Sequence, residues 1–231
     1  MRRAVVNLGP RRMTTKTTRD IAAAAGACIA CSAAAAALPP GFVRLADLAP
    51  QIVQDMRYAG SDNFTGRPVP GYKAPQCWLR EDAARALVAA QQEAKSRGFE
   101  LIIYDCYRPR RAVSAFIDWA KGADESMKAQ YYPHENKLDL FKRGYIAEKS
   151  SHSTGLAVDL GVLGWDFGTP FDFFDERSWT ASKDVSEEAR AHRATLEALM
   201  RRHGFENLPT EWWHYAFRGA AGAPSFDVEI E

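Results

Sequence analysis

The chain has 231 residues, of which 30 are Lys or Arg and 29 are Asp or Glu, so its formal net charge is +1. This balance excludes a protein that binds nucleic acid through a broad basic surface, because such binding needs many uncompensated phosphate contacts. Hydrophobic residues make up 46% and charged residues 26%, which is ordinary for a globular domain and excludes intrinsic disorder over most of the chain.

The first 40 residues differ in composition from the rest. Basic residues up to Arg19 precede an Ala-rich apolar run from Ile21 to Leu38, and two prolines follow. A basic start, an apolar middle and small residues before a boundary are typical of a secretory signal. We therefore expect residues 1–40 to be a signal peptide and the protein to be exported, to the periplasm or an equivalent compartment. The alternative is an N-terminal extension on a cytoplasmic protein. Stable membrane insertion is not expected, because alanine contributes little insertion energy.

The remainder contains no linker, repeat or low-complexity stretch, so we predict a single domain over residues 41–231. A helix is predicted over Arg80–Arg97, where small and apolar residues recur at helical spacing and Gly98 can end the helix. A buried strand follows over Phe99–Tyr104, and a second helix is predicted over Arg110–Lys121.

Three more elements are predicted towards the C-terminus. Residues Gly155–Leu160 form a strand that is entered through a glycine turn. Asp184 and Glu187 have the spacing of a capping box, which predicts a third helix that runs to His203. The last strand covers Trp212–Phe217. Helices and strands are mixed without regular alternation, which favours the α+β class over a doubly wound sheet.

Two segments together supply metal-ligating side chains. His152 and Asp159 lie seven positions apart, across the glycine turn and into the apolar strand. A carboxylate in such a strand is costly to bury unless it is paired or bound to metal. The second segment contains Glu211 and His214. His, Asp and His are donors typical of catalytic Zn²⁺, and Glu211 is then a spare carboxylate suited to take a proton from a water molecule.

Each of these pieces alone also has an ordinary structural explanation. A His and an Asp at this spacing can be a surface histidine and a capping carboxylate, and Trp212 and Trp213 can be core aromatics. The His-Glu-x-x-His signature of helical zinc proteases is absent from the sequence. Arg108, just after the first predicted strand, can place a guanidinium where it stabilises an oxyanion.

The order of the motifs is more specific than any one of them. Ser-x-His-x-x-Gly-x-Ala-x-Asp-Leu over residues 150–160, followed by Glu-Trp-Trp-His-Tyr over residues 211–215, resembles the D-alanyl-D-alanine dipeptidases associated with vancomycin resistance. These zinc peptidases are related to D,D-carboxypeptidases and to the hedgehog fold. Further matches lie at Tyr58 and at residues 62–66, 105–113 and 171–177. The resemblance implies one hedgehog-like catalytic domain, in which a small antiparallel sheet with flanking helices carries the zinc site.

The resemblance also implies the catalytic roles. It identifies His152, Asp159 and His214 as the ligands of one Zn²⁺ per chain, Glu211 as the catalytic base, and Arg108 as the group that polarises the scissile carbonyl. The implied reaction is the zinc-dependent hydrolysis of the D-alanyl-D-alanine dipeptide to two D-alanines.

The substrate-binding residues come from the same resemblance. Asp172 matches the carboxylate that holds the free ammonium of the substrate. Ser150 or Ser151 is expected to meet the terminal carboxylate, and Tyr58 is expected to line the pocket. The partner is therefore a small dipeptide, and the sequence does not indicate an oligomeric state.

Two other functions remain open at this point. The first is a cell-wall D,D- or L,D-carboxypeptidase with the same zinc site in an open cleft, but Asp172 and the aromatic residues around it favour a closed pocket for a free dipeptide. The second is a non-catalytic binding module that contains a metal. Glu211 and Arg108 weigh against that module, because binding zinc requires neither residue.

Cys77 and Cys106 are the only cysteines left if the N-terminal segment is removed. Two cysteines in an exported domain favour one disulfide. They lie at the two ends of a predicted helix-then-strand unit, which runs out and back and brings its ends close together. The alternative is a pair of buried free thiols.

Overall fold

A five-stranded sheet forms the centre of the fold in the computed structural model, which describes residues 37–147 and 149–231. The predicted signal segment, residues 1–40, lies almost entirely outside the described residues. Among the described residues, none of the helices combines the length and the apolar character that crossing a bilayer requires.

The strand order in this sheet is β2-β4-β5-β7-β6. Neighbouring strands are antiparallel except for β2, which pairs with β4 in parallel. Strands β1 and β3 form a separate antiparallel pair. The predicted α+β class is confirmed, with a parallel edge strand in a mainly antiparallel sheet. The strands are β1 (Phe42–Arg44), β2 (Val53–Gln54), β3 (Trp78–Arg80), β4 (Leu101–Asp105), β5 (Ala157–Val162), β6 (Phe205–Asn207) and β7 (His214–Phe217).

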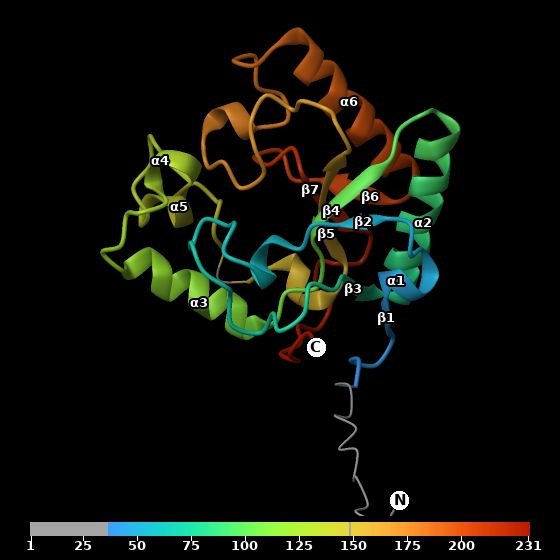
Figure 1. Cartoon of the computed structure of the whole chain (residues 1–231), viewed down its shortest axis with the longest axis horizontal. Coiled ribbons are helices and arrows are strands. Elements are labelled where there is room, and N and C mark those ends of the chain that lie inside the picture. Colours follow the sequence, from blue (N-terminus) through green and yellow to red (C-terminus); the bar gives the residue numbers. More distant parts are fainter. Residues whose placement is uncertain (1–36, 148) are drawn as a thin grey trace, which may run out of the picture. The chain divides into compact units, whose positions relative to one another are not determined.

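Three long helices flank the sheet. Figure 1 shows α2 (Glu81–Ser96) and α6 (Glu187–Arg202) close together on one side, and α3 (Arg110–Lys121) on the other. The short helices are α1 (Leu45–Leu48), α4 (Lys128–Tyr131) and α5 (Asp139–Lys142), with 3-10 turns over Arg57–Ala59, Ser151–Thr154 and Glu176–Ser178. The predicted bounds of α3 are confirmed, and those of α2 differ by one residue at each end.

The predicted start of α6 is wrong. The side-chain oxygen of Ser186, and not that of Asp184, accepts the hydrogen bond from the backbone N–H of Ala189. Ser186 is therefore the N-cap, because its own backbone is non-helical and its hydroxyl satisfies a free N–H of the first turn. The backbone N–H of Asp184 donates instead to the Ser182 hydroxyl, at 3.4 Å.

The register of the central strands gathers the candidate site residues. Asp159 on β5 lies opposite His214 on β7 and opposite Asp105 on β4. All six residues of β5 are buried, so this strand is covered on both faces. Consequently, residues that are far apart in sequence meet at one end of three adjacent strands.

Candidate active site

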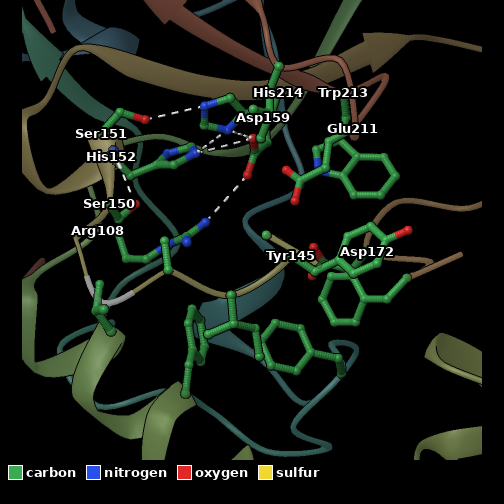
Figure 2. A pocket seen from close by; sticks show the side chains of 18 of the residues that line it. Arg108, Tyr145, Ser150, Ser151, His152, Asp159, Asp172, Glu211, Trp213 and His214 are labelled. Carbon is green, nitrogen blue, oxygen red and sulfur yellow. Dashed lines mark hydrogen bonds and ion pairs between the residues drawn. The ribbon is translucent and has the colours of Figure 1, made fainter. Parts of the chain in front are cut away.

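Three potential metal ligands converge on one point. His152 Nε2 lies 3.2 Å from Asp159 Oδ1 and 3.0 Å from His214 Nδ1, and the remaining pair, His214 Nδ1 and Asp159 Oδ1, is 3.0 Å apart (Figure 2). In a tetrahedral zinc site with bonds of ~2.0–2.1 Å, neighbouring donors lie about 3.3 Å apart. The two imidazoles and the carboxylate therefore fit a zinc ion in both chemistry and spacing.

The outer nitrogens of the two histidines are hydrogen-bonded. His152 Nδ1 lies 2.6 Å from the carbonyl oxygen of Cys106. A carbonyl can only accept, so Nδ1 carries the hydrogen and Nε2 presents its lone pair to the metal position. His214 Nε2 lies 3.2 Å from the hydroxyl of Ser151. Burial lowers the pKa of His214, which favours the neutral imidazole that a metal requires.

Arg108 is held next to these ligands by buried carboxylates. Its Nε donates to Asp105 Oδ2 at 3.0 Å, and its Nη2 lies 3.4 Å from Asp159 Oδ2. The Tyr72 hydroxyl donates to the other oxygen of Asp105, at 2.8 Å. Neither Asp105 nor Tyr72 was assigned a role from the sequence. The available sequence signal for Asp105 was its position: it ends a buried strand and lies three positions before a candidate catalytic arginine.

The carboxylates of Glu211 and Asp172 also face the cavity. They lie on the opposite side of the three potential ligands from Ser150 and Ser151 (Figure 2). Burial raises the pKa of Glu211 well above its usual range, and the carboxylates of Asp159 and Asp172 raise it further. Burial, again with the charge of Asp159, raises the pKa of Asp172 in the same way. Such shifted carboxyl groups are typical of sites that handle protons or bind a compensating cation.

Asp172 occupies an unusual backbone conformation. Its φ is +60°, and no other non-glycine residue in the described part of the chain has a positive φ. Such a conformation costs ~1–3 kcal/mol and is retained where the surroundings enforce it. The loop that carries Asp172 is bridged by Arg193 on α6, whose guanidinium donates to the carbonyls of Phe167 and Trp179, at 2.8 and 2.7 Å. The two carbonyls flank the loop that carries Asp172.

These groups line a cavity of about 310 Å³. This is near the lower end of the ~300–1,000 Å³ typical of ligand sites, so the cavity suits a small molecule. Every residue that the sequence analysis placed at the substrate or the metal lines it, together with buried aromatic rings: Tyr58, Arg108, Ser150, Ser151, His152, Asp159, Asp172, Glu211 and His214, with Phe64, Phe116, Phe174 and Trp213.

The two serines make contacts that sequence did not indicate. The Ser150 hydroxyl accepts from the backbone N–H of His152 at 3.3 Å, and the Ser151 hydroxyl contacts His214. Both side chains therefore support the histidines. Their expected contact with a substrate carboxylate stays a prediction.

Cys77 and Cys106 are joined by a disulfide, with their Cα atoms 5.2 Å apart. Both cysteines are buried. The bond links the residue before β3 to the residue after β4, and so ties the strand end that carries Asp105 and Arg108 to the second sheet.

Comparison with known proteins identifies the family of the chain. The family described as D-ala-D-ala dipeptidase matches residues 39–229. The chain belongs to the D-alanyl-D-alanine dipeptidase family. It is 38% identical over 185 residues to the D-alanyl-D-alanine dipeptidase of Enterococcus faecium, covering 77% of this chain and 92% of that one. The corresponding enzyme of Enterococcus faecalis is 37% identical, with 76% of this chain and 90% of that one covered.

A solved structure, the LdcB LD-carboxypeptidase, is also similar, with 18% identity and a TM-score of 0.43 over 79% of this chain and 72% of that one. The sequence relatives alone establish the family. They confirm the predicted enzyme class, a dipeptidase among the metallopeptidases.

Proposed function

We propose that this dipeptidase hydrolyses free D-Ala-D-Ala at a single zinc ion held by His152, Asp159 and His214, with Glu211 as the base. The observation that carries the proposal is the convergence of three donor atoms within 3.2 Å of one another, in the cavity that also contains Glu211 and Arg108. A binding module would need the three ligands but not a buried carboxyl group and a partly buried guanidinium beside them.

The charge of the cavity supports a substrate with a free amino terminus. The carboxylates of Asp159, Asp172 and Glu211 line the cavity, and Arg108 contacts Asp159 but makes no ion pair with Asp172. An ammonium group beside Asp172 gives this carboxylate a counter-charge, whereas a blocked amine does not. Because an unpaired buried charge is costly, the site favours a free dipeptide over the blocked end of a longer chain.

The side chains of the cavity have different roles in the proposed reaction. Asp172, fixed by the Tyr58 hydroxyl, holds the substrate ammonium and so places the peptide bond between Glu211 and Arg108. When bound, zinc supplies Lewis acidity, which makes water acidic enough to lose a proton near neutral pH and polarises the carbonyl. Glu211 takes that proton and later delivers it to the leaving amine. Arg108 donates to the carbonyl oxygen as its negative charge develops.

A comparison of substrates tests the proposal. Zinc-loaded protein is assayed on D-Ala-D-Ala, L-Ala-L-Ala, N-acetyl-D-Ala-D-Ala and a pentapeptide that ends in D-Ala-D-Ala, and its metal content is measured. We expect one zinc per chain and turnover of the free D,D-dipeptide far above that of the blocked and extended substrates. Preferential cleavage of the pentapeptide would instead assign a carboxypeptidase, and a zinc-loaded protein without hydrolysis would assign a binding module.

We also propose that the enzyme acts outside the cytoplasm, with a mature chain that begins near Pro39 to Phe42. The support is the basic, then Ala-rich, then Pro-containing order of residues 1–40. Cell fractionation followed by N-terminal sequencing tests this. Protein that retains Met1 and stays in the cytoplasm would contradict export without affecting the proposed reaction.

A further inference from the structure

One backbone carbonyl sets the orientation of a proposed metal ligand. The carbonyl oxygen of Cys106 accepts the Nδ1 hydrogen of His152 at 2.6 Å. In return, the backbone N–H of Arg108 donates to the carbonyl of His152 at 3.2 Å. These two bonds connect the segment after β4 to the 3-10 turn that carries His152. The position of the Cys106 peptide therefore determines whether His152 Nε2 faces the other two ligands.

Cys77 is the fixed end of the disulfide that holds Cys106. Its backbone N–H donates to the side-chain oxygen of Gln54 at 2.8 Å, and its carbonyl accepts from the backbone N–H of Leu45 at 2.9 Å. Both polar groups of the Cys77 backbone are thus bound to the neighbouring structure. Its Sγ then holds the residue whose carbonyl contacts His152.

We propose that the Cys77–Cys106 disulfide is a positioning element of the metal site. By fixing the Cys106 carbonyl, it keeps His152 Nε2 directed at the metal and slows the loss of zinc. The proposal rests on the function proposed above, because it takes zinc as the bound metal. Groups that orient a metal-bound histidine through its other nitrogen are worth ~10- to 100-fold in metal affinity. We expect a dissociation rate raised by about tenfold or more when the disulfide is absent.

The matched pair of variants is Cys77→Ala and Leu79→Ala. Cys77→Ala removes the bond but leaves the Cys106 peptide in the chain. Leu79, on β3, is buried like Cys77 and does not line the active-site cavity. Its truncation therefore weakens the same part of the core without touching the connection to His152. The pair separates positioning from a general loss of stability.

The experiment measures zinc release from the full chain into an excess of a chromogenic chelator. Wild type and both variants are loaded with zinc and compared at temperatures equally far below their own Tm values. We expect release about tenfold faster from Cys77→Ala and within about twofold of wild type from Leu79→Ala. Equal rates in Cys77→Ala and wild type, or equal acceleration in the two variants, would overturn the proposal.

A second variant covers the case in which Cys77→Ala does not fold. Cys106→Ala breaks the same disulfide from the other side and retains a carbonyl at position 106, so it should release zinc equally fast. If wild type itself retains no zinc, the proposed function fails as well. If wild type retains zinc and both cysteine variants release it no faster, only the positioning role fails.

Discussion

Tyr58 donates its phenolic hydrogen to Oδ2 of Asp172 at 2.9 Å, although 114 positions separate the two residues in sequence. Both are buried, and the bond fixes the carboxylate on the far side of the cavity from Ser150 and Ser151. Because Tyr58 supplies one hydrogen, the Asp172 carboxylate keeps acceptor capacity for an ammonium group.

Asp172→Asn should lower kcat/KM for D-Ala-D-Ala by about 100-fold or more, mainly through a higher KM. Losing one partner of a buried charge pair costs ~2–5 kcal/mol, and asparagine retains the size and the bond from Tyr58 but not the charge. Tyr58→Phe, which removes only the supporting hydroxyl, should cost ~10-fold. Steady-state kinetics with both variants checks that Asp172→Asn loses more activity than Tyr58→Phe. An Asp172→Asn enzyme with an unchanged KM would mean that another group holds the ammonium.

The same carboxylate should make the metal-free protein sensitive to pH. Burial raises the pKa of Asp172 in the folded protein above the ~3.9 of an unfolded chain. The folded state therefore loses stability as the pH rises from about 4 through the raised pKa, because folding then opposes ionisation. Asp172→Asn removes this loss.

In chelator-treated protein, the Tm advantage of Asp172→Asn over wild type should be small at pH 4 and larger at pH 8. We therefore expect the free energy of unfolding of Asp172→Asn, relative to that of wild type, to rise over this pH range. Thermal melts across this range check the trend. A Tm advantage that shrinks with rising pH would show that burial does not oppose the ionisation of Asp172.

Glu211→Gln should keep one zinc per chain and lose about 100- to 10,000-fold in kcat, because general acid–base groups contribute on this scale. Glutamine retains the shape of Glu211 but cannot accept the proton, and Glu211→Ala should behave alike. Metal analysis and turnover are measured on the same samples. His214→Ala is the contrasting variant, because it should lose the metal itself. Near wild-type turnover by zinc-loaded Glu211→Gln would assign the base to another group.

The convergence of the three proposed metal ligands could be predicted from sequence because each lies in a short motif with a recognisable order. The antiparallel pairing of β5 and β7 then places Asp159 opposite His214, and the glycine turn brings His152 back to them. The residues that orient these groups could not be predicted. The bond from His152 to the Cys106 carbonyl and the pair between Arg108 and Asp105 depend on how loops pack in space.

The capping-box rule for helix starts also failed at α6, where more than one residue can act as the N-cap. Asp184 has the spacing of a capping box, yet Ser186 is the N-cap of α6, because two capping residues two positions apart offer alternative starts. The role of Arg193 could not be predicted from the sequence either. An arginine on a charged helix suggests a solvated side chain, and only the fold brings it to two carbonyls that flank the Asp172 loop.

Arg193→Met should lower the free energy of unfolding by ~2–4 kcal/mol. Burial lowers the pKa of Arg193 to about 10, so the buried guanidinium is still charged at neutral pH and donates to the carbonyls of Phe167 and Trp179. Methionine fills similar space but leaves both carbonyls without this donor, at ~1–3 kcal/mol each. Arg190→Met, on an exposed position of the same helix, should change stability by less than ~0.5 kcal/mol. Denaturant unfolding of the two variants checks this difference. Equal losses of stability would show that Arg193 does not hold the loop that carries Asp172.

Gly155→Ala should be among the most damaging single-methyl changes near the site. Gly155 has a φ of +74°, and a Cβ there would lie 2.3 Å from the Phe42 ring, well inside van der Waals contact. Its backbone N–H donates to the carbonyl of His152, so any shift of this turn also moves a proposed metal ligand.

Gly144→Ala is the matched control for this substitution. Gly144 has a φ of +81°, but a Cβ there would meet nothing within 4 Å. Its cost should be only the left-handed backbone penalty of ~1–2 kcal/mol. Gly155→Ala adds the overlap with Phe42, which should bring its cost to ~3 kcal/mol or more and weaken zinc retention. Denaturant unfolding and zinc content are measured for both. If the two variants lose equal stability and retain equal zinc, the contact between Phe42 and the turn does not constrain the metal site.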